Sequence, residues 1–124
     1  MKKQLMLLIT ALLLVTAFAV MRINSTGAAT QTEVSYVRDV QPILESRCGN
    51  CHFGEFTSAD LHMDRYESLM TGSESGPVIL AGDARKSLLV KKISTGAMPK
   101  RGPKLTPAQI QVISDWIDAG AQDN

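Results

Sequence analysis

A CxxCH motif is the feature that most constrains this chain of 124 residues. The motif is formed by Cys48, Gly49, Asn50, Cys51 and His52, and it contains the only two cysteines of the sequence. In a helical turn, residues three apart lie on one face, so both thiols can reach a single flat group while the histidine presents its imidazole to a central metal. This pattern is typical of c-type haem attachment, in which the thiols bond to the two vinyl groups. We therefore expect one covalently attached haem c, held by Cys48 and Cys51, with His52 as an axial ligand of its iron.

Three other interpretations of the motif are weaker. A structural zinc site needs four ligands, and the only other histidine is His62, so one full set is missing. A thioredoxin-like redox site requires a βαβ context, and no strand-like alternation surrounds these cysteines. A disulfide between residues three apart is sterically awkward and gives His52 no role.

The N-terminal 29 residues have the pattern of an export segment. Met1-Lys2-Lys3 is basic, residues 5–21 are apolar, and the chain turns polar at Arg22. This order is typical of a signal peptide, although the apolar stretch is also close to the shortest that can span a bilayer. We expect export to a bacterial periplasm, with the protein soluble after cleavage or anchored to the inner membrane through residues 5–21.

The exported part is weakly acidic. Removing Lys2, Lys3 and Arg22 from the 13 basic residues leaves ten, against 12 acidic ones, so its formal charge is −2. This balance argues against nucleic-acid binding. A domain this small buries only a modest fraction of its surface, so we expect the haem to complete its core and the haem-free chain to be largely unfolded.

The periodicity of the sequence predicts an all-α domain over residues 36–124, after a polar linker at 30–35. A first helix is expected to begin regularly near Val40, with Pro42 in its first turn, and to extend to about Arg47.

Three further helices are expected downstream. A short one is predicted to end at Met70, with Asp64 and Glu67 as its capping box. Another is expected from Asp83 to about Ile93, with Leu88, Leu89 and Ile93 on its apolar side and Arg85, Lys86, Lys91 and Lys92 on its solvated side. The start of the last helix is the clearest, with Thr106 as N-cap, Pro107 at N1 and Gln109 at N3. Gly120 is expected to end this helix. Its apolar face contains Trp116, which we expect in the core.

Residues 34–121 resemble a single-haem c-type cytochrome, in particular the planctomycete-type cytochrome c domain. The segments that carry the resemblance are DVQPIL at 39–44, RCGNCH at 47–52, GPVI at 76–79 with GDARKSLL at 82–89, and MP at 98–99 followed by KLT at 104–106 and WIDAGA at 116–121. The resemblance implies a small class I-like fold in which the first and last helices cross beside the haem. It also implies that a methionine before the last helix, here Met98, is the sixth iron ligand.

The residues themselves agree with Met98 but leave rivals. A distal ligand must reach the haem face opposite His52, and a loop stiffened by Pro99 and Pro103 can hold a thioether there. His62 is the main alternative, because imidazole also binds ferric iron, and a water-bound or open site is the other. Met63 and Met70 are expected to pack the haem pocket, as are Phe53 and Tyr66, and Lys100, Arg101 and Lys104 are candidates to neutralise a haem propionate.

With His52 and Met98 both bound, the iron has no vacant position, which favours electron transfer over catalysis. We therefore expect a one-electron carrier, not an enzyme, cycling between Fe(III) and Fe(II) with redox proteins as donor and acceptor. The alternatives are a haem domain that binds or senses a small ligand, or a subunit of a larger redox complex. Carbon monoxide binding to the reduced protein separates the carrier from the ligand-binding domain.

Overall fold

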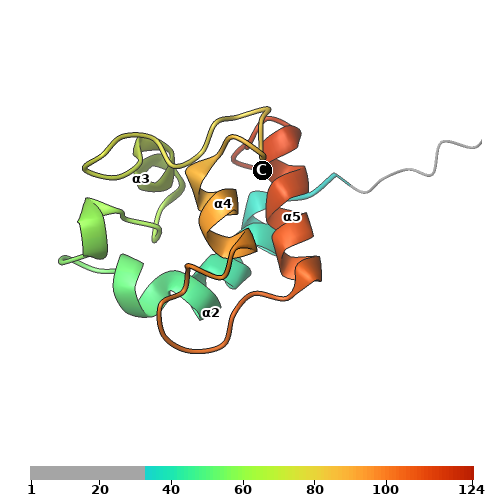
Figure 1. Ribbon diagram of the computed structural model, residues 1–124. Helices are drawn as coiled ribbons and strands as arrows, with labels where there is room; N and C mark the ends of the chain where they lie inside the picture. The colour runs from blue at the N-terminus through green and yellow to red at the C-terminus, as the bar shows by residue number, and fades with distance from the viewer. Residues whose placement is uncertain (1–32) are drawn as a thin grey trace, which may run out of the picture. The chain divides into compact units, whose positions relative to one another are not determined.

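The computed structural model describes residues 33–124, and this part of the chain is helical. Its elements are η1 (Tyr36–Val40), α2 (Gln41–His52), η2 (Ser58–Asp60), α3 (Tyr66–Thr71), α4 (Leu88–Ser94) and α5 (Pro107–Asp118) (Figure 1). Over residues 33–124 the only β-type pairing is an isolated bridge between Ser73 and Gly76. The fold is thus all-α, as expected.

The expected export segment, residues 1–29, and the first part of the expected linker lie outside the described residues. Within residues 33–124, no helix combines the length and the apolar character needed to cross a membrane.

The first helical segment starts with a π-helical turn, η1, and continues as α2. Pro42 lies in the first turn of α2, where its missing N–H costs no hydrogen bond. The helix extends beyond Arg47, where we expected its end, and finishes at His52. Leu44 and His52 are its buried residues, so both ends of α2 are held against the rest of the fold. The whole CxxCH motif therefore belongs to the end of one helix.

The starts of α3 and α4 differ from the sequence prediction. The N-cap of α3 is Arg65, which places Glu67 at N2 instead of N3, so no capping box forms with Asp64. Residues 83–87 form a turn in which Oδ1 of Asp83 accepts the Lys86 N–H at 3.0 Å. Helix α4 begins only at Leu88, because the buried Ser87 hydroxyl ties this turn to residue 80, accepting the Leu80 N–H at 2.8 Å.

Helix α5 begins and ends where the sequence predicted. The Thr106 hydroxyl accepts the Gln109 N–H, and the Gln109 side chain accepts the Thr106 N–H, so the capping box is complete. Gly120 follows the helix with φ +108°, a conformation that favours glycine at the position after a C-cap. Helix α5 packs against α4 and η1, which brings the two ends of the domain together (Figure 1).

An aromatic cluster of Tyr36, Tyr66 and Trp116 forms the core at this junction. The ring centroids of Tyr36 lie 5.3 Å from Tyr66 and 5.2 Å from Trp116. The Tyr66 hydroxyl donates to the Ala121 carbonyl at 2.8 Å, and the Trp116 indole N–H donates to the Gln122 carbonyl at 2.8 Å. Trp116 is therefore a core residue, as expected, and it anchors the chain that follows α5.

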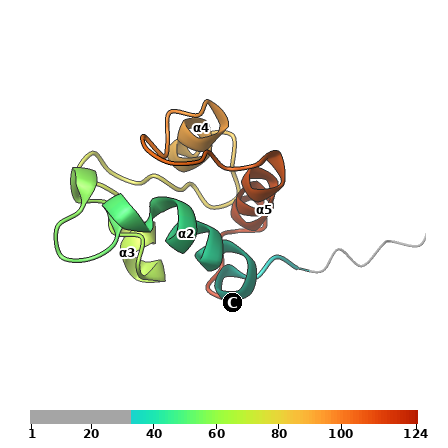
Figure 2. The same cartoon turned by 90° about the horizontal axis from the view of Figure 1, so that it is seen from below.

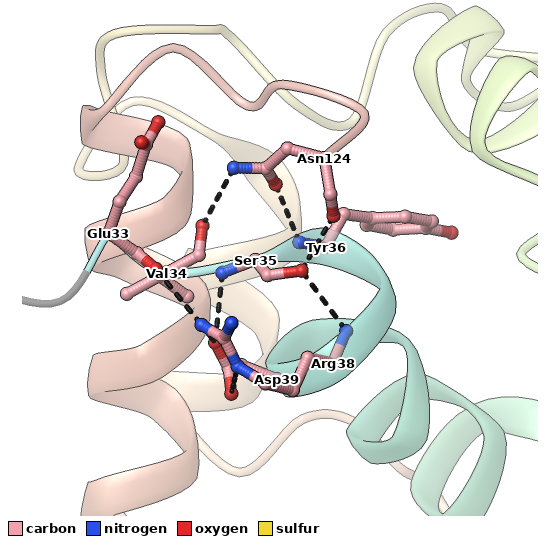
Figure 3. A network of polar contacts seen from close by, with 7 residues as sticks. All are labelled: Glu33, Val34, Ser35, Tyr36, Arg38, Asp39 and Asn124. Carbon is pink, nitrogen blue, oxygen red and sulfur yellow. Dashed lines mark hydrogen bonds and ion pairs between the residues drawn. The ribbon is translucent and has the colours of Figure 1, made fainter.

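Hydrogen bonds also join the two ends of the described domain directly (Figure 3). Oγ of Ser35 donates to the Asn124 carbonyl at 2.6 Å, and the Tyr36 N–H donates to Oδ1 of Asn124 at 2.8 Å. Asp39 accepts the Ser35 N–H at 2.9 Å and pairs with Arg38 at 2.7 Å. Residues 33–39 are thereby fixed beside the segment that follows α5.

Candidate functional site

A cavity of about 520 Å³ lies between α2 and the α4 region. Figure 2 shows α4 and the loop after it on one side of the domain and α2 with α3 on the other, with the extended segment after α3 running between them. Cys48, Cys51 and His52 line the cavity from α2, and Leu89 and Met98 line it from the other side. Its volume falls within the range of about 300–1,000 Å³ that holds cofactors.

Both thiols of the motif face this cavity and are free. Cys48 is partly buried and Cys51 is exposed. Burial, and to a smaller extent the neighbouring Cys51, raises the pKa of the Cys48 thiol to about 11. One helical turn therefore presents both sulfur atoms, spaced three residues apart, to the same hollow.

The imidazole of His52 is buried and held by a backbone contact. Its Nδ1 lies 3.2 Å from the Leu61 carbonyl oxygen. The tautomer that donates from Nδ1 to this oxygen leaves the lone pair of Nε2 free for a metal, and the bond fixes the ring orientation. The Met63 N–H donates to the His52 carbonyl at 2.8 Å, so the chain at 61–63 folds back over the end of α2.

Met98 reaches the same cavity from the loop between α4 and α5. Its N–H donates to the Lys92 carbonyl at 3.0 Å, which ties the loop to the last turn of α4. The Lys104 ammonium donates to the Pro99 carbonyl within the loop. The thioether thus comes from an element separate from the one that carries His52, as a distal ligand requires.

The rival ligands are placed differently. His62 is half-exposed and does not line the cavity; its Nε2 lies 3.5 Å from Oδ1 of Asp60. Met63 lines the cavity and is buried, whereas Met70 packs against the core away from it. Phe53 and Tyr66 do not line the cavity either, so the expectation that they pack against the haem was wrong, and Tyr66 belongs to the aromatic cluster instead.

Four basic side chains line the cavity: Arg47, Lys92, Lys100 and Arg101. Lys100 and Arg101 were expected here, whereas Lys104 lies outside the lining set and contacts the loop instead. Arg47 was not predicted to line the cavity, although its position directly before the CxxCH motif could have indicated this. Lys92 was missed because we assigned it to the solvated side of its helix.

Leu88 was also placed on the wrong side by helical periodicity. It was expected on the buried side of α4, but it is 41% exposed and lines the cavity. A large apolar ligand in the cavity would cover the exposed side chain of Leu88.

The residues present fit a covalently attached haem. Two thiols at the required spacing, an imidazole with Nε2 free, a thioether and apolar walls meet in one cavity. Nitrogen and sulfur are the donor atoms that haem iron takes in cytochromes c. Within residues 33–124, no three His, Cys, Asp or Glu side chains gather to hold a bare metal ion, so the zinc interpretation gains no support.

Comparisons with known proteins bear on the same segment. No curated protein and no solved structure matches the chain. The family model described as planctomycete cytochrome C matches residues 48–102, a range that starts at the first cysteine of the motif and includes Met98. Residues 48–102 are therefore similar to the planctomycete cytochrome C family, in agreement with the sequence resemblance.

Proposed function

We propose that this chain is an exported one-electron carrier whose single haem is held by Cys48 and Cys51 and whose iron is ligated by His52 and Met98. The haem, when bound, supplies one-electron exchange between ferric and ferrous iron. The proposal includes a periplasmic location and redox proteins as donor and acceptor.

One observation carries the proposal: His52 and Met98 line one cavity from two separate elements, together with both thiols. The family match supports a cytochrome role, and the two cysteines fit its attachment motif. If His52 and Met98 both hold the iron, no coordination position would be left for a substrate. Electron transfer through the haem edge is then favoured over conversion of a substrate at the iron.

The chain's residues have separate tasks in this function. Leu61 holds the ring of His52 through its carbonyl oxygen, which keeps Nε2 available. The hydrogen bond from Met98 to Lys92 holds the loop that presents the thioether. A thioether ligand favours the ferrous state more than a second imidazole does, so this ligand set favours a comparatively high reduction potential.

The test is the absorption spectrum of the oxidised holoprotein and of two matched variants, Met98→Leu and Met63→Leu. Both variants replace a cavity-lining methionine by a side chain of similar volume, so packing changes little. We expect the weak far-red band of a sulfur-to-iron bond in the natural protein and in Met63→Leu, and its loss in Met98→Leu. Absence of the band from the natural protein would shift the assignment to His62.

Carbon monoxide separates the carrier from a ligand-binding haem domain. We expect the spectrum of the reduced natural protein to stay unchanged when the gas is added, because both axial positions are filled. The Met98→Leu protein should bind it. Rapid binding to the natural protein would favour the small-ligand function instead.

A further inference from the structure

The charged side chains that line the cavity all have the same sign. They are Arg47, Lys92, Lys100 and Arg101, and no Asp or Glu is among the lining residues. We call these four residues the basic rim. Lys92, Lys100 and Arg101 are exposed, whereas Arg47 is partly buried and its Nε has no hydrogen-bond partner. The ion pairs of the described residues involve none of the four.

The basic rim contrasts with the rest of the domain. Residues 33–124 contain ten Lys or Arg and 12 Asp or Glu, for a formal charge of −2. The four rim residues carry +4, so the remainder carries −6. A charge distribution this uneven gives the cavity mouth a local potential opposite in sign to that of the whole domain.

The haem itself does not use up this positive charge. It brings two propionate carboxylates, against four cations on the rim. Its vinyl groups, which bond to the thiols, lie on the edge opposite the propionates. Arg47 directly precedes Cys48 in α2, so its backbone lies beside the thiols that would bond to the vinyl edge.

We propose that the basic rim is the docking surface for a redox protein whose own electron-transfer face is rich in carboxylates. This inference rests on the proposed function. Complementary charge would steer the acidic partner toward the cavity mouth in preference to the acidic remainder of the domain. Redox encounters bury little surface, so a few rim cations suffice to orient the partner while allowing rapid release.

The net charge of the domain and the charge of the rim predict opposite behaviour, which makes the sign testable with small oxidants. The reduced holoprotein is mixed with hexacyanoferrate(III) or with tris(phenanthroline)cobalt(III), each of which takes one electron from the ferrous haem. We expect the rate with the anionic oxidant to rise as ionic strength falls, and the rate with the cationic oxidant to fall. The reverse dependence would mean that the net charge governs approach, and would overturn the proposal.

Matched charge-reversal variants locate the effect. Lys92→Glu/Lys100→Glu changes the rim, whereas Arg65→Glu/Arg85→Glu makes the same change of net charge at exposed residues that do not line the cavity. At low ionic strength we expect the rim variant to react with hexacyanoferrate(III) about tenfold more slowly, and the control variant to change less than about twofold. Equal effects of the two variants would contradict a local docking surface.

A macromolecular probe tests the kind of partner. Poly-L-glutamate is added to the reduced, 15N-labelled holoprotein, and we expect shifts of the amide signals at the rim that disappear in high salt and in the rim variant. Shifts elsewhere would overturn the proposal. Rim shifts produced only by phosphatidylglycerol vesicles would assign the surface to a membrane and overturn it too. A protein that exchanges electrons with neither oxidant would contradict the proposed function, and the amide shifts would still decide whether the rim binds an acidic chain.

Discussion

Tyr36 is a buried tyrosine whose hydroxyl has no hydrogen-bond partner. Its ring packs between Tyr66 and Trp116, and the residue is only 3% exposed. Burial, with smaller contributions from acidic residues beginning with Asp123, raises the pKa of Tyr36 from 10.0 to about 12. The native state therefore holds the phenolic proton more tightly than the unfolded chain does.

We expect this difference to appear as a loss of stability in alkali. The contribution of Tyr36 is fully present below about pH 10 and is lost as the pH rises toward 12, because the unfolded chain ionises first. The measurement is the pH titration of 13C-labelled tyrosine by NMR in Tyr66→Phe, which leaves Tyr36 as the only tyrosine. A midpoint near 10 in the folded Tyr66→Phe protein would contradict the burial argument.

Some residues that line the cavity could be predicted from the sequence, and others could not. Cys48, Cys51 and His52 follow one another in a single helix end, so their spacing alone brings them to one face. Lys92 could not be located in this way, because its helical face is both near solvent and at the mouth of the cavity. Periodicity distinguishes buried from exposed, but it does not distinguish solvent from the edge of a cofactor site.

Among the elements, the turn after α3 depends on one glycine. Gly72 has φ +97°, and a Cβ at this position would lie 2.5 Å from the Gly76 carbonyl oxygen and 2.6 Å from Cα of Pro77. Both contacts are with backbone atoms of the segment paired through the Ser73–Gly76 bridge, so neither can be relieved by a side-chain rotation.

Gly54 provides a matched control for this turn, because it has the same φ of +97° but a Cβ added there would meet no atom within 4 Å. We expect Gly54→Ala to lower the free energy of unfolding by about 1–2 kcal/mol through the left-handed conformation alone. Gly72→Ala should cost about 1–3 kcal/mol more because of the steric clash. Chemical denaturation of both holoproteins measures the difference, and equal losses would show that the clash is relieved by backbone movement.

Helices α4 and α5 illustrate what local sequence predicts at this scale. The start of α5 follows from contacts among residues 106–109, which are neighbours in the chain, so the capping pattern was sufficient. The start of α4 depends instead on Ser87, whose hydroxyl is drawn into a bond with Leu80 and out of a capping role. The side chain of Asp83 does accept a backbone hydrogen bond, as a capping residue would, but this bond stabilises a turn and not the start of α4.

For the whole molecule, the cavity of about 520 Å³ separates α2 from α4 and its loop. Its lining includes the apolar side chains of Leu61, Leu89 and Ile93, which a haem would cover and which the haem-free chain leaves without a neighbour. Burial of apolar surface is the main favourable contribution to the stability of a domain this small. The hydrogen bonds that join Ser35 and Tyr36 to Asn124 close the fold but do not cover these side chains.

We therefore expect a Cys48→Ala/Cys51→Ala protein, which cannot attach haem covalently, to be largely unfolded. The measurement is far-UV circular dichroism of this variant compared with the holoprotein. Helix content equal to that of the holoprotein would show that the protein core is sufficient by itself. Each single cysteine variant is a useful intermediate, because one thioether bond still retains the haem.

The sequence by itself determined the all-α class, the CxxCH motif with His52 at its end, and the bounds of α5, because each depends on residues that are near neighbours in the chain. Only the tertiary structure brought Met98 into the cavity of His52 while leaving His62 outside it. It alone gathered Arg47, Lys92, Lys100 and Arg101 around that cavity. These placements join segments that are far apart in the sequence, and they depend on how α4 and its loop pack opposite α2, which no local pattern encodes.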